Sequence, residues 1–344
     1  MDPQSNKNDL LAAWSSLKSF SGADGWRTIP ISHQGLIKVL AGRCYPSNAE
    51  SILIEFKNIK KTDNRPLPEG KGFIVCEVNF ESTNNSESQW YAINKKPGSN
   101  IDFFLMMSSD LLDLFKLYEH LDSFNLYKLF ISRIKSWQDF MNREYSGKLS
   151  YEYEIGLFGE LELFSRLSKF EISVDEILNS WKGPESSLHD YVSSRGAIEV
   201  KSTVSNSGFN VTIGSLEQLD SSLVPRLFLI GFRFIEGEGE TLIEKIESVK
   251  KLFGNNSQSL ELFNNLILEM GYLPEFASKY TNRFLFNSLK VFEVNNEFPS
   301  LTRRAVKRPI VNANYKLNLD LIDTLEVEFK SLKNIYEVIL SGTN

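Results

Sequence analysis

A short stretch with charged side chains at fixed spacing constrains this sequence more than any other feature. Residues 197–204 alternate between apolar and polar side chains. This alternation predicts a β-strand, because successive side chains of a strand point to opposite faces. The period of two places Glu199, Lys201 and Thr203 on one face of the strand. One face is therefore polar and the other is apolar.

A second expected strand turns this polar face into a cluster. Residues 188–192 predict a short strand, and residues 193–196, Ser-Ser-Arg-Gly, have the composition of a hairpin turn. Folding back at this turn brings Asp190 towards Glu199. The sequence therefore predicts a hairpin on which two carboxylates converge.

Two carboxylates and a lysine arranged in this way suit phosphodiester hydrolysis. Mg²⁺ takes oxygen ligands and is usually held by one or two carboxylates, so Asp190 and Glu199 are candidate ligands. A bound metal polarises the phosphate and makes a nucleophile of water. Lys201 is a candidate to orient or deprotonate that water, or to offset charge that develops on the phosphate. The alternative is a solvated polar strand face, because Glu-x-Lys pairs on strands are common.

At these residues the chain resembles the PD-(D/E)XK nuclease superfamily, whose core is a hairpin with Asp on one strand and Glu-x-Lys on the next. Here the motif is Asp190 followed by Glu199-Val200-Lys201, and His189 stands where the superfamily name has Pro. A narrower resemblance is to a PD-(D/E)XK motif family often encoded among bacterial anti-phage genes. The flanking residues that carry this narrower resemblance are Trp181, Gly183, Pro184, His189, Tyr191, Ser202 and Thr203.

The resemblance implies a metal-dependent DNA endonuclease that acts in bacterial defence against foreign DNA. Its cofactor would be Mg²⁺, with Mn²⁺ as a substitute, and other defence proteins would be its partners. A double-strand break by one such site requires a homodimer or two successive nicks. The rival hypothesis is a non-catalytic subunit that keeps the nuclease fold to bind DNA or a partner protein in a multi-protein defence complex.

Two further residues become candidates through their place in the chain. The apolar spacing of residues 153–167 predicts a helix, and Glu160 lies at the edge of its buried stripe. The resemblance implies that Glu160 packs under the catalytic sheet and helps to bind the metal. The alternative is an exposed carboxylate paired with Arg166 or Lys169. The resemblance also implies that Gln218, at the start of an expected helix, faces the scissile phosphate; the alternative is a helix-surface glutamine.

The order of the expected elements supports this interpretation. After the helix at 153–167 and the hairpin come a strand at 209–213, a helix from residue 215 and a strand at 227–234. This αβββαβ order resembles a restriction-endonuclease-like core, so the expected fold class is α/β within an α+β multi-domain protein. We expect residues 141–240 to form that core.

Accessory regions are expected on both sides of the core. Residues 1–140 predict an N-terminal α/β domain that contains a sheet, and residues 241–344 predict a mainly helical region that also contains strands. The expected strands of the first domain lie at 35–40, 51–56, 72–80 and 89–93, and its helices at 101–115 and 124–141. The expected helices of the last region lie at 241–253, 257–270 and 322–340, and its strands at 284–294 and 315–319.

Composition sets limits on the compartment. Cys44 and Cys76 stand in no metal-like spacing, which argues against a zinc site or a disulfide scaffold and fits a reducing compartment. The first residues show no signal-peptide pattern, and no apolar run reaches membrane-spanning length. We therefore expect a cytoplasmic protein that does not associate with a membrane.

Charge distribution bears on nucleic-acid binding. The net charge of −6 argues weakly against a protein that coats nucleic acid, although local basic patches can coexist with an acidic total. The densest basic patch contains Arg303, Arg304, Lys307 and Arg308. It is a candidate for contacts to phosphates or to a partner protein, and the alternative is a solvated loop.

Overall fold

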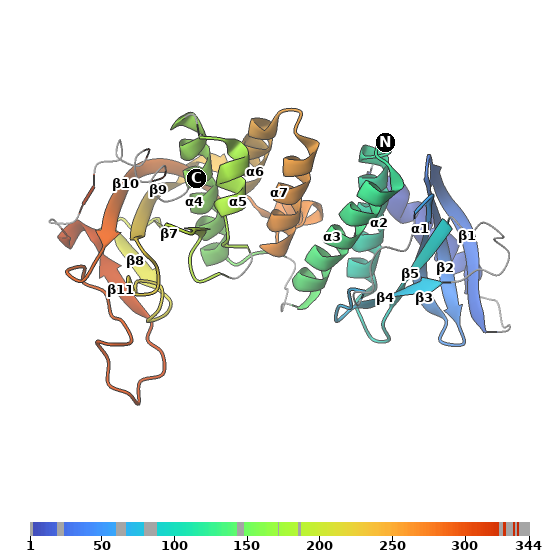
Figure 1. Cartoon of the computed structure of the whole chain (residues 1–344), viewed down its shortest axis with the longest axis horizontal. Coiled ribbons are helices and arrows are strands. Elements are labelled where there is room, and N and C mark those ends of the chain that lie inside the picture. The colour runs from blue at the N-terminus through green and yellow to red at the C-terminus, as the bar shows by residue number, and fades with distance from the viewer. Residues whose placement is uncertain are drawn as a thin grey trace. The chain divides into compact units, whose positions relative to one another are not determined.

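The computed structural model describes residues 3–18, 24–59, 67–78, 88–142, 148–170, 172–184, 187–322, 326, 327, 333 and 336. The chain divides into two compact units, Met1–Glu144 and Tyr145–Asn344 (Figure 1). The expected boundary between residues 140 and 141 lies close to this division. No helix in the described ranges is both long and apolar enough to cross a bilayer.

The first unit is built on an antiparallel sheet with strand order β1-β2-β3-β5-β4. Its strands are β1 (Gly25–Gln34), β2 (Ile37–Tyr45), β3 (Ala49–Lys57), β4 (Phe73–Val78) and β5 (Ser88–Lys95), and its helices are α1 (Pro3–Leu17), α2 (Ile101–Leu117) and α3 (Ser123–Asn142). The structure thus has strands at the four positions expected from the sequence, together with β1. The short connections from β1 to β2 and from β2 to β3 favour antiparallel pairing of these strands.

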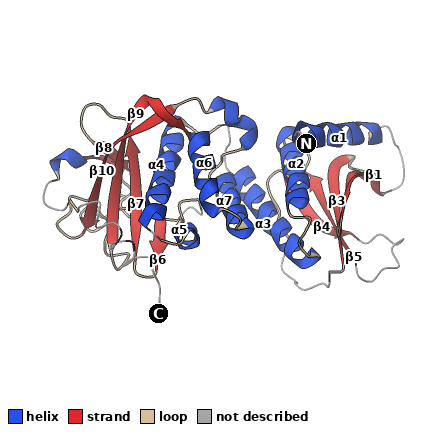
Figure 2. Cartoon of the chain, turned by 90° about the horizontal axis from the view of Figure 1, so that it is seen from above, coloured by secondary structure: helices blue, strands red, loops and turns tan. Residues whose placement is uncertain are grey.

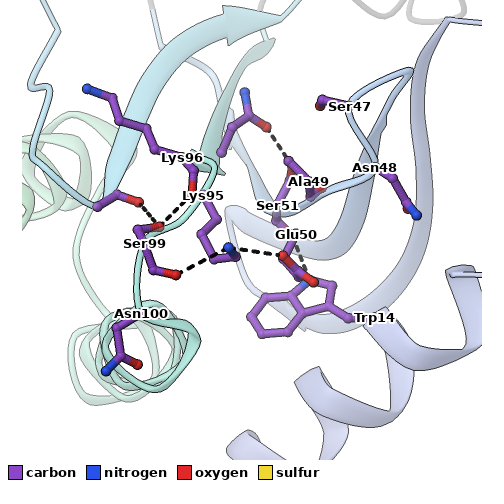
Figure 3. Close-up of polar contacts among 12 residues, drawn as sticks. Trp14, Ser47, Asn48, Ala49, Glu50, Ser51, Lys95, Lys96, Ser99 and Asn100 are labelled. Carbon is purple, nitrogen blue, oxygen red and sulfur yellow. Dashed lines mark hydrogen bonds and ion pairs between the residues drawn. The ribbon is translucent and has the colours of Figure 1, made fainter.

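Hydrogen bonds close one end of this sheet against the first helix (Figure 3). The indole N–H of Trp14, on α1, donates to the Ser51 carbonyl at 2.9 Å. The Ser51 hydroxyl donates to the Asn94 side chain at 2.6 Å, and the Lys95 ammonium lies 3.6 Å from a Glu50 carboxylate oxygen. The Trp14 bond therefore ties α1 to β3, and the other two contacts join β3 to β5.

The second unit has a central mixed sheet with strand order β10-β9-β7-β6, in which β7 and β9 run parallel and the other neighbours antiparallel. A separate two-stranded sheet pairs β8 with β11. The strands are β6 (Tyr191–Ser193), β7 (Gly196–Thr203), β8 (Asn210–Ile213), β9 (Leu227–Thr241), β10 (Arg283–Val294) and β11 (Tyr315–Asn318). The helices are α4 (Tyr151–Leu167), α5 (Val174–Ser180), α6 (Leu242–Lys250) and α7 (Ser257–Glu269).

Local sequence signals explain where the helices of this unit begin. Ser150 caps α4 by accepting a hydrogen bond from the Tyr153 amide. Thr241 and Glu244 form a capping box at the start of α6, in which each side chain accepts a hydrogen bond from the other residue's amide. These contacts satisfy amides that have no partner within the helix.

Alternate residues of β9 enter two different apolar cores. Phe228 and Ile230 pack in a core that includes residues of α4, whereas Leu227 and Leu229 pack in a core that includes residues of β8. A strand buried on both faces has a continuous apolar sequence, which is the pattern of residues 227–232. Figure 2 shows α4 lying beside β7.

The region after residue 241 belongs to this same compact unit. β10 pairs with β9 along most of its length, and Ile246 of α6 and Phe263 of α7 contribute to the core that also contains residues of α4. The contacts therefore give two units where we expected three parts. The expected closing helix at 322–340 lies almost entirely outside the described residues.

Two expectations for the αβββαβ order are wrong. No helix begins at residue 215, because residues 214–226 form turns. The Asp220 carboxylate accepts hydrogen bonds from the amide and hydroxyl of Ser222, and such local contacts compete with helix formation. The strand at 210–213 is present, but it pairs with β11 and not with the central sheet.

Buried ion pairs connect α4 with α6. The Lys245 ammonium lies 2.8 Å from Glu162 and 2.7 Å from Glu240, and Arg166 pairs with Glu162 at 2.6 Å. Lys245 is only 6% exposed. The two helices are therefore joined by charges that have little access to water, in addition to their apolar contacts.

We expect Lys245→Ala to lower the free energy of unfolding by about 2 kcal/mol, because it removes a buried charge-assisted hydrogen bond between α6 and Glu162 of α4. Urea unfolding followed by circular dichroism measures this. The control is Lys250→Ala, which removes the more exposed pair with Glu247 on the same helix and should cost less than about 1 kcal/mol. Equal effects of the two substitutions would contradict the assignment.

Candidate active site

The hairpin expected from the sequence is present, although its first strand is shorter. Tyr191 pairs with Ile198, so Asp190 lies directly before β6 and level with Glu199 in the antiparallel register. The Asp190 carboxylate accepts a hydrogen bond from the Val200 amide at 2.7 Å. The structure thus brings these two carboxylates together, as the sequence predicted.

Glu199 and Lys201 form a close hydrogen-bonded pair on β7. The Lys201 ammonium lies 2.5 Å from the Oε1 atom of Glu199. Glu199 is 1% exposed, and its second carboxylate oxygen, Oε2, is buried with no hydrogen-bond partner. A buried acceptor without a partner is unfavourable for folding and indicates a place for a ligand or an ion.

Glu160 is part of the same cluster. It is buried on α4, where its Oε2 atom accepts a hydrogen bond from the Trp181 indole at 2.6 Å and its carbonyl accepts one from the Tyr191 hydroxyl at 2.8 Å. The alternative of an exposed Glu160 paired with Arg166 is wrong, because Arg166 pairs with Glu162. The helix therefore turns this carboxylate towards the hairpin.

Gly183 lies between the two carboxylates. A Cβ atom at this residue would be 2.5 Å from Oε2 of Glu160 and 3.3 Å from Oδ1 of Asp190. Both carboxylate oxygens therefore lie next to Gly183, and so they lie close to each other. The amides of Lys182 and Gly183 both donate to the Asp190 carbonyl, at 2.6 and 3.0 Å. The segment Trp181–Gly183 therefore positions both acids. Sequence reasoning noted it only as a mark of resemblance.

Comparison with known protein families shows which family the chain belongs to. Residues 10–320 match the family model described as "Putative PD-(D/E)XK family member, (DUF4420)". The chain belongs to this PD-(D/E)XK family. Neither a curated protein nor a solved structure matches it significantly. The family assignment indicates a nuclease-like fold.

The electrostatics of this PD-(D/E)XK cluster are dominated by burial. Burial, and then repulsion from Asp190, raise the pKa of Glu199 to about 8, against the opposing effect of Lys201. Burial also raises the pKa of Asp190, and burial with repulsion from Asp190 raises that of Glu160. Glu199 and Glu160 are therefore held where Asp190 disfavours their charged forms.

The pKa of Lys201 is also raised, but for a lysine this favours the charged form. Burial alone would lower its pKa, but the neighbouring carboxylates, Glu199 first and then Asp190, outweigh burial and raise the pKa above its ordinary value. The side chain is therefore a cation over the whole physiological pH range. It can stabilise negative charge, and in this state it cannot accept a proton.

Gln218 does not enter the cluster. Its side-chain oxygen accepts a hydrogen bond from the Gly214 amide at 2.7 Å, which closes a local turn in place of the expected helix. Its carbonyl oxygen lies 3.0 Å from Nε2 of the buried His189. The expectation that the Gln218 side chain faces the substrate is not supported, although its backbone is joined to the residue before Asp190.

The donor set of the cluster fits a hard divalent cation held by few protein ligands. No three His, Cys, Asp or Glu side chains in the described ranges are arranged to hold a metal ion. Mg²⁺, however, commonly takes only one or two carboxylates and fills its shell with water. Asp190 and Glu199, with the unpaired Oε2 of Glu199, meet that smaller requirement.

We expect the affinity for Mn²⁺ to rise as the pH increases from 6 to 8. The raised pKa of Glu199, about 8, means that the folded apoprotein holds a proton there that a cation must displace. Affinity should therefore fall by up to about tenfold for each pH unit below 8. An acid whose pKa is raised in the folded state lowers the stability of the apoprotein as the pH rises. Because metal binds most tightly at pH 8, the stabilisation by metal should be largest at that pH.

Isothermal titration calorimetry with Mn²⁺ at pH 6, 7 and 8 measures this dependence. The control is Glu199→Gln, which carries no titrating proton at this position and should bind weakly with a flatter pH profile. An affinity of the wild type that does not change between pH 6 and 8 would contradict the prediction.

Proposed function

We propose that this protein is a divalent-metal-dependent DNA endonuclease that hydrolyses phosphodiester bonds. The observation that carries the proposal is the convergence of Asp190, Glu199 and Glu160 on Lys201, with one Glu199 oxygen left unpaired in a buried position. Membership of the PD-(D/E)XK family supports the same class of reaction.

The roles of the residues follow from their charges and contacts. Asp190 and Glu199 would hold Mg²⁺, with Mn²⁺ as a substitute, and Glu160 would assist directly or through water. The bound ion would supply Lewis acidity towards a phosphate oxygen and a lowered pKa for water. Lys201 would stabilise the negative charge that develops on the phosphate, since its raised pKa keeps it protonated. The acid–base role of Lys201 weighed from sequence is thus the less favoured one.

Trp181 and Tyr191 would act as positioning residues. Each donates one hydrogen bond to Glu160, one to its carboxylate and one to its carbonyl. Supporting contacts of this kind hold a ligand's orientation and tune its basicity. Glu160 is therefore held in place before any metal or substrate arrives.

The biological setting belongs to the same proposal. We propose that the protein acts in the bacterial cytoplasm as an effector against foreign DNA, alone or with other defence proteins. With one such cluster in each chain, a double-strand break would need two copies or two successive nicks. The proposal therefore includes a homodimer or a nicking activity on duplex DNA.

A non-catalytic DNA-binding or partner-binding subunit is the second candidate. The observation that favours it is the close Lys201–Glu199 pair, which occupies one of the two oxygens that a metal would use. In that case the charged cluster would serve stability or recognition only. Activity measurements separate the two candidates.

Asp190→Asn and Glu199→Gln should each reduce metal-dependent cleavage of plasmid DNA by at least about 10²-fold, because each removes a charged metal ligand without changing side-chain volume. Both should remain folded by circular dichroism. The matched control is Glu293→Gln, a carboxylate on β10 that pairs with Arg226 outside the cluster. If either test variant cleaves like the control, the assigned site is wrong.

Lys201→Ala should reduce the single-turnover cleavage rate by about 10²- to 10⁴-fold, yet bind DNA nearly as the wild type, because the ammonium acts mainly in the transition state. Lys201→Arg should also be impaired, since a planar guanidinium does not replace a compact ammonium in a packed site. Lys290→Ala, a lysine on β10 paired with Asp320, is the control. Normal cleavage by Lys201→Ala would contradict the role assigned to Lys201. No cleavage by the wild type with any metal or partner would favour the non-catalytic function.

A further inference from the structure

We propose that the segment 303–308, between β10 and β11, is a phosphate-binding loop that grips the DNA backbone next to the candidate active site. The binding side chains would be those of Arg304, Lys307 and Arg308. This inference rests on the proposed function, because it takes DNA as the substrate. It adds a binding surface that the catalytic cluster does not supply.

The charge of this loop differs from that of the chain as a whole. The protein has a net charge of −6, yet no acidic residue lies between Glu297 and Asp320. The cations in that interval are Arg303, Arg304, Lys307, Arg308 and Lys316. A positive segment in an acidic protein is suited to binding a polyanion such as DNA. The negatively charged remainder of the surface repels the polyanion, so binding is directed to the positive segment.

The loop has defined turns that hold its cations in place. The Ala305 amide donates to the Thr302 carbonyl at 3.0 Å, and the Ile310 amide donates to the Lys307 carbonyl at 2.9 Å. Figure 1 shows this connection as a long orange loop that extends away from the strands. Ordered turns reduce the entropy that is lost when side chains bind a ligand.

Arg303 has a different role from its neighbours. Its guanidinium donates to the carbonyls of Ile310 and Val311, at 2.8 and 2.6 Å, and pairs with Glu217 at 2.9 Å. It therefore ties both arms of the loop together and fixes them to the turn segment that follows β8. Its charge is already used within the protein.

That turn segment connects the loop to the catalytic cluster. Glu217, the partner of Arg303, is followed by Gln218, whose carbonyl lies 3.0 Å from the His189 ring. His189 directly precedes Asp190. A short series of contacts thus runs from Arg303 of the basic loop to the candidate metal ligand, and one DNA duplex would contact both the loop and the cluster.

The three remaining cations of the segment 303–308 are free to bind a ligand. Arg304, Lys307 and Arg308 are exposed, and no described residue pairs with any of them. Contacts from such side chains to phosphates position a duplex without reading its sequence. The loop would therefore set affinity and register, and would leave any sequence preference to other parts of the protein.

The test is the triple variant Arg304→Gln, Lys307→Gln, Arg308→Gln, with fluorescence anisotropy on a short duplex in EDTA across a salt series. We expect at least about tenfold weaker binding at low salt, and a salt dependence of log K that is shallower by about 2.7, or 0.9 for each lost phosphate contact. With Mg²⁺ present, KM should rise while kcat at saturating DNA stays near the wild-type value.

The matched control removes three cations elsewhere in the same unit, with Lys250→Gln, Lys251→Gln and Lys279→Gln. It should bind DNA like the wild type. If the loop variant binds with the affinity and salt dependence of this control, the inference is overturned, which is also the result expected if the loop binds an acidic protein. If the wild type binds DNA through the loop but never cleaves it, the inference stands and the proposed function fails.

Discussion

The burial of three carboxylates around one lysine is the constraint on which the second unit depends. Moving an ionised carboxylate out of water is costly unless the group is paired, hydrogen-bonded or protonated. Each of the three carboxylates has a partner. Glu160 accepts a hydrogen bond from the Trp181 indole, and Asp190 accepts one from the Val200 amide. Glu199 pairs with Lys201. One oxygen of Glu199 has none. That missing partner makes the cluster a candidate for binding an ion, since the fold leaves one strong acceptor unsatisfied.

Close packing between α4 and β7 makes this arrangement possible. Gly159 lies so near to Ser202 that a Cβ atom would collide with the Ser202 hydroxyl. A larger residue at this position, next to Glu160, would require the Ser202 side chain to move. The α4–α6 ion pairs around Glu162 and Lys245 then hold the helix from its other side. The charged site and the charged support are separate networks on one helix.

The first turn after β8 joins the candidate active site to the basic loop. It holds Gln218, whose carbonyl contacts His189, and Glu217, which pairs with Arg303 of the basic loop. Neither contact depends on regular secondary structure. Irregular segments that carry polar groups on a rigid scaffold are common locations for binding functions. Residues 214–226 form no helix, so the neighbouring residues Glu217 and Gln218 can contact different partners.

The sequence by itself determined the hairpin and the identity of its acids. Alternation with a period of two fixes which side chains of residues 197–204 share a face, and a short turn fixes that Asp190 meets Glu199, because both are local properties of the chain. Only the tertiary structure decided the fate of Glu160, since a carboxylate at the edge of a helix stripe can be exposed or buried with equal local cost. Its partners, Trp181 and Tyr191, are distant in sequence. The pairing of β8 with β11, like the placement of Arg303 against Glu217, also joins residues about a hundred positions apart, and no local pattern records such contacts.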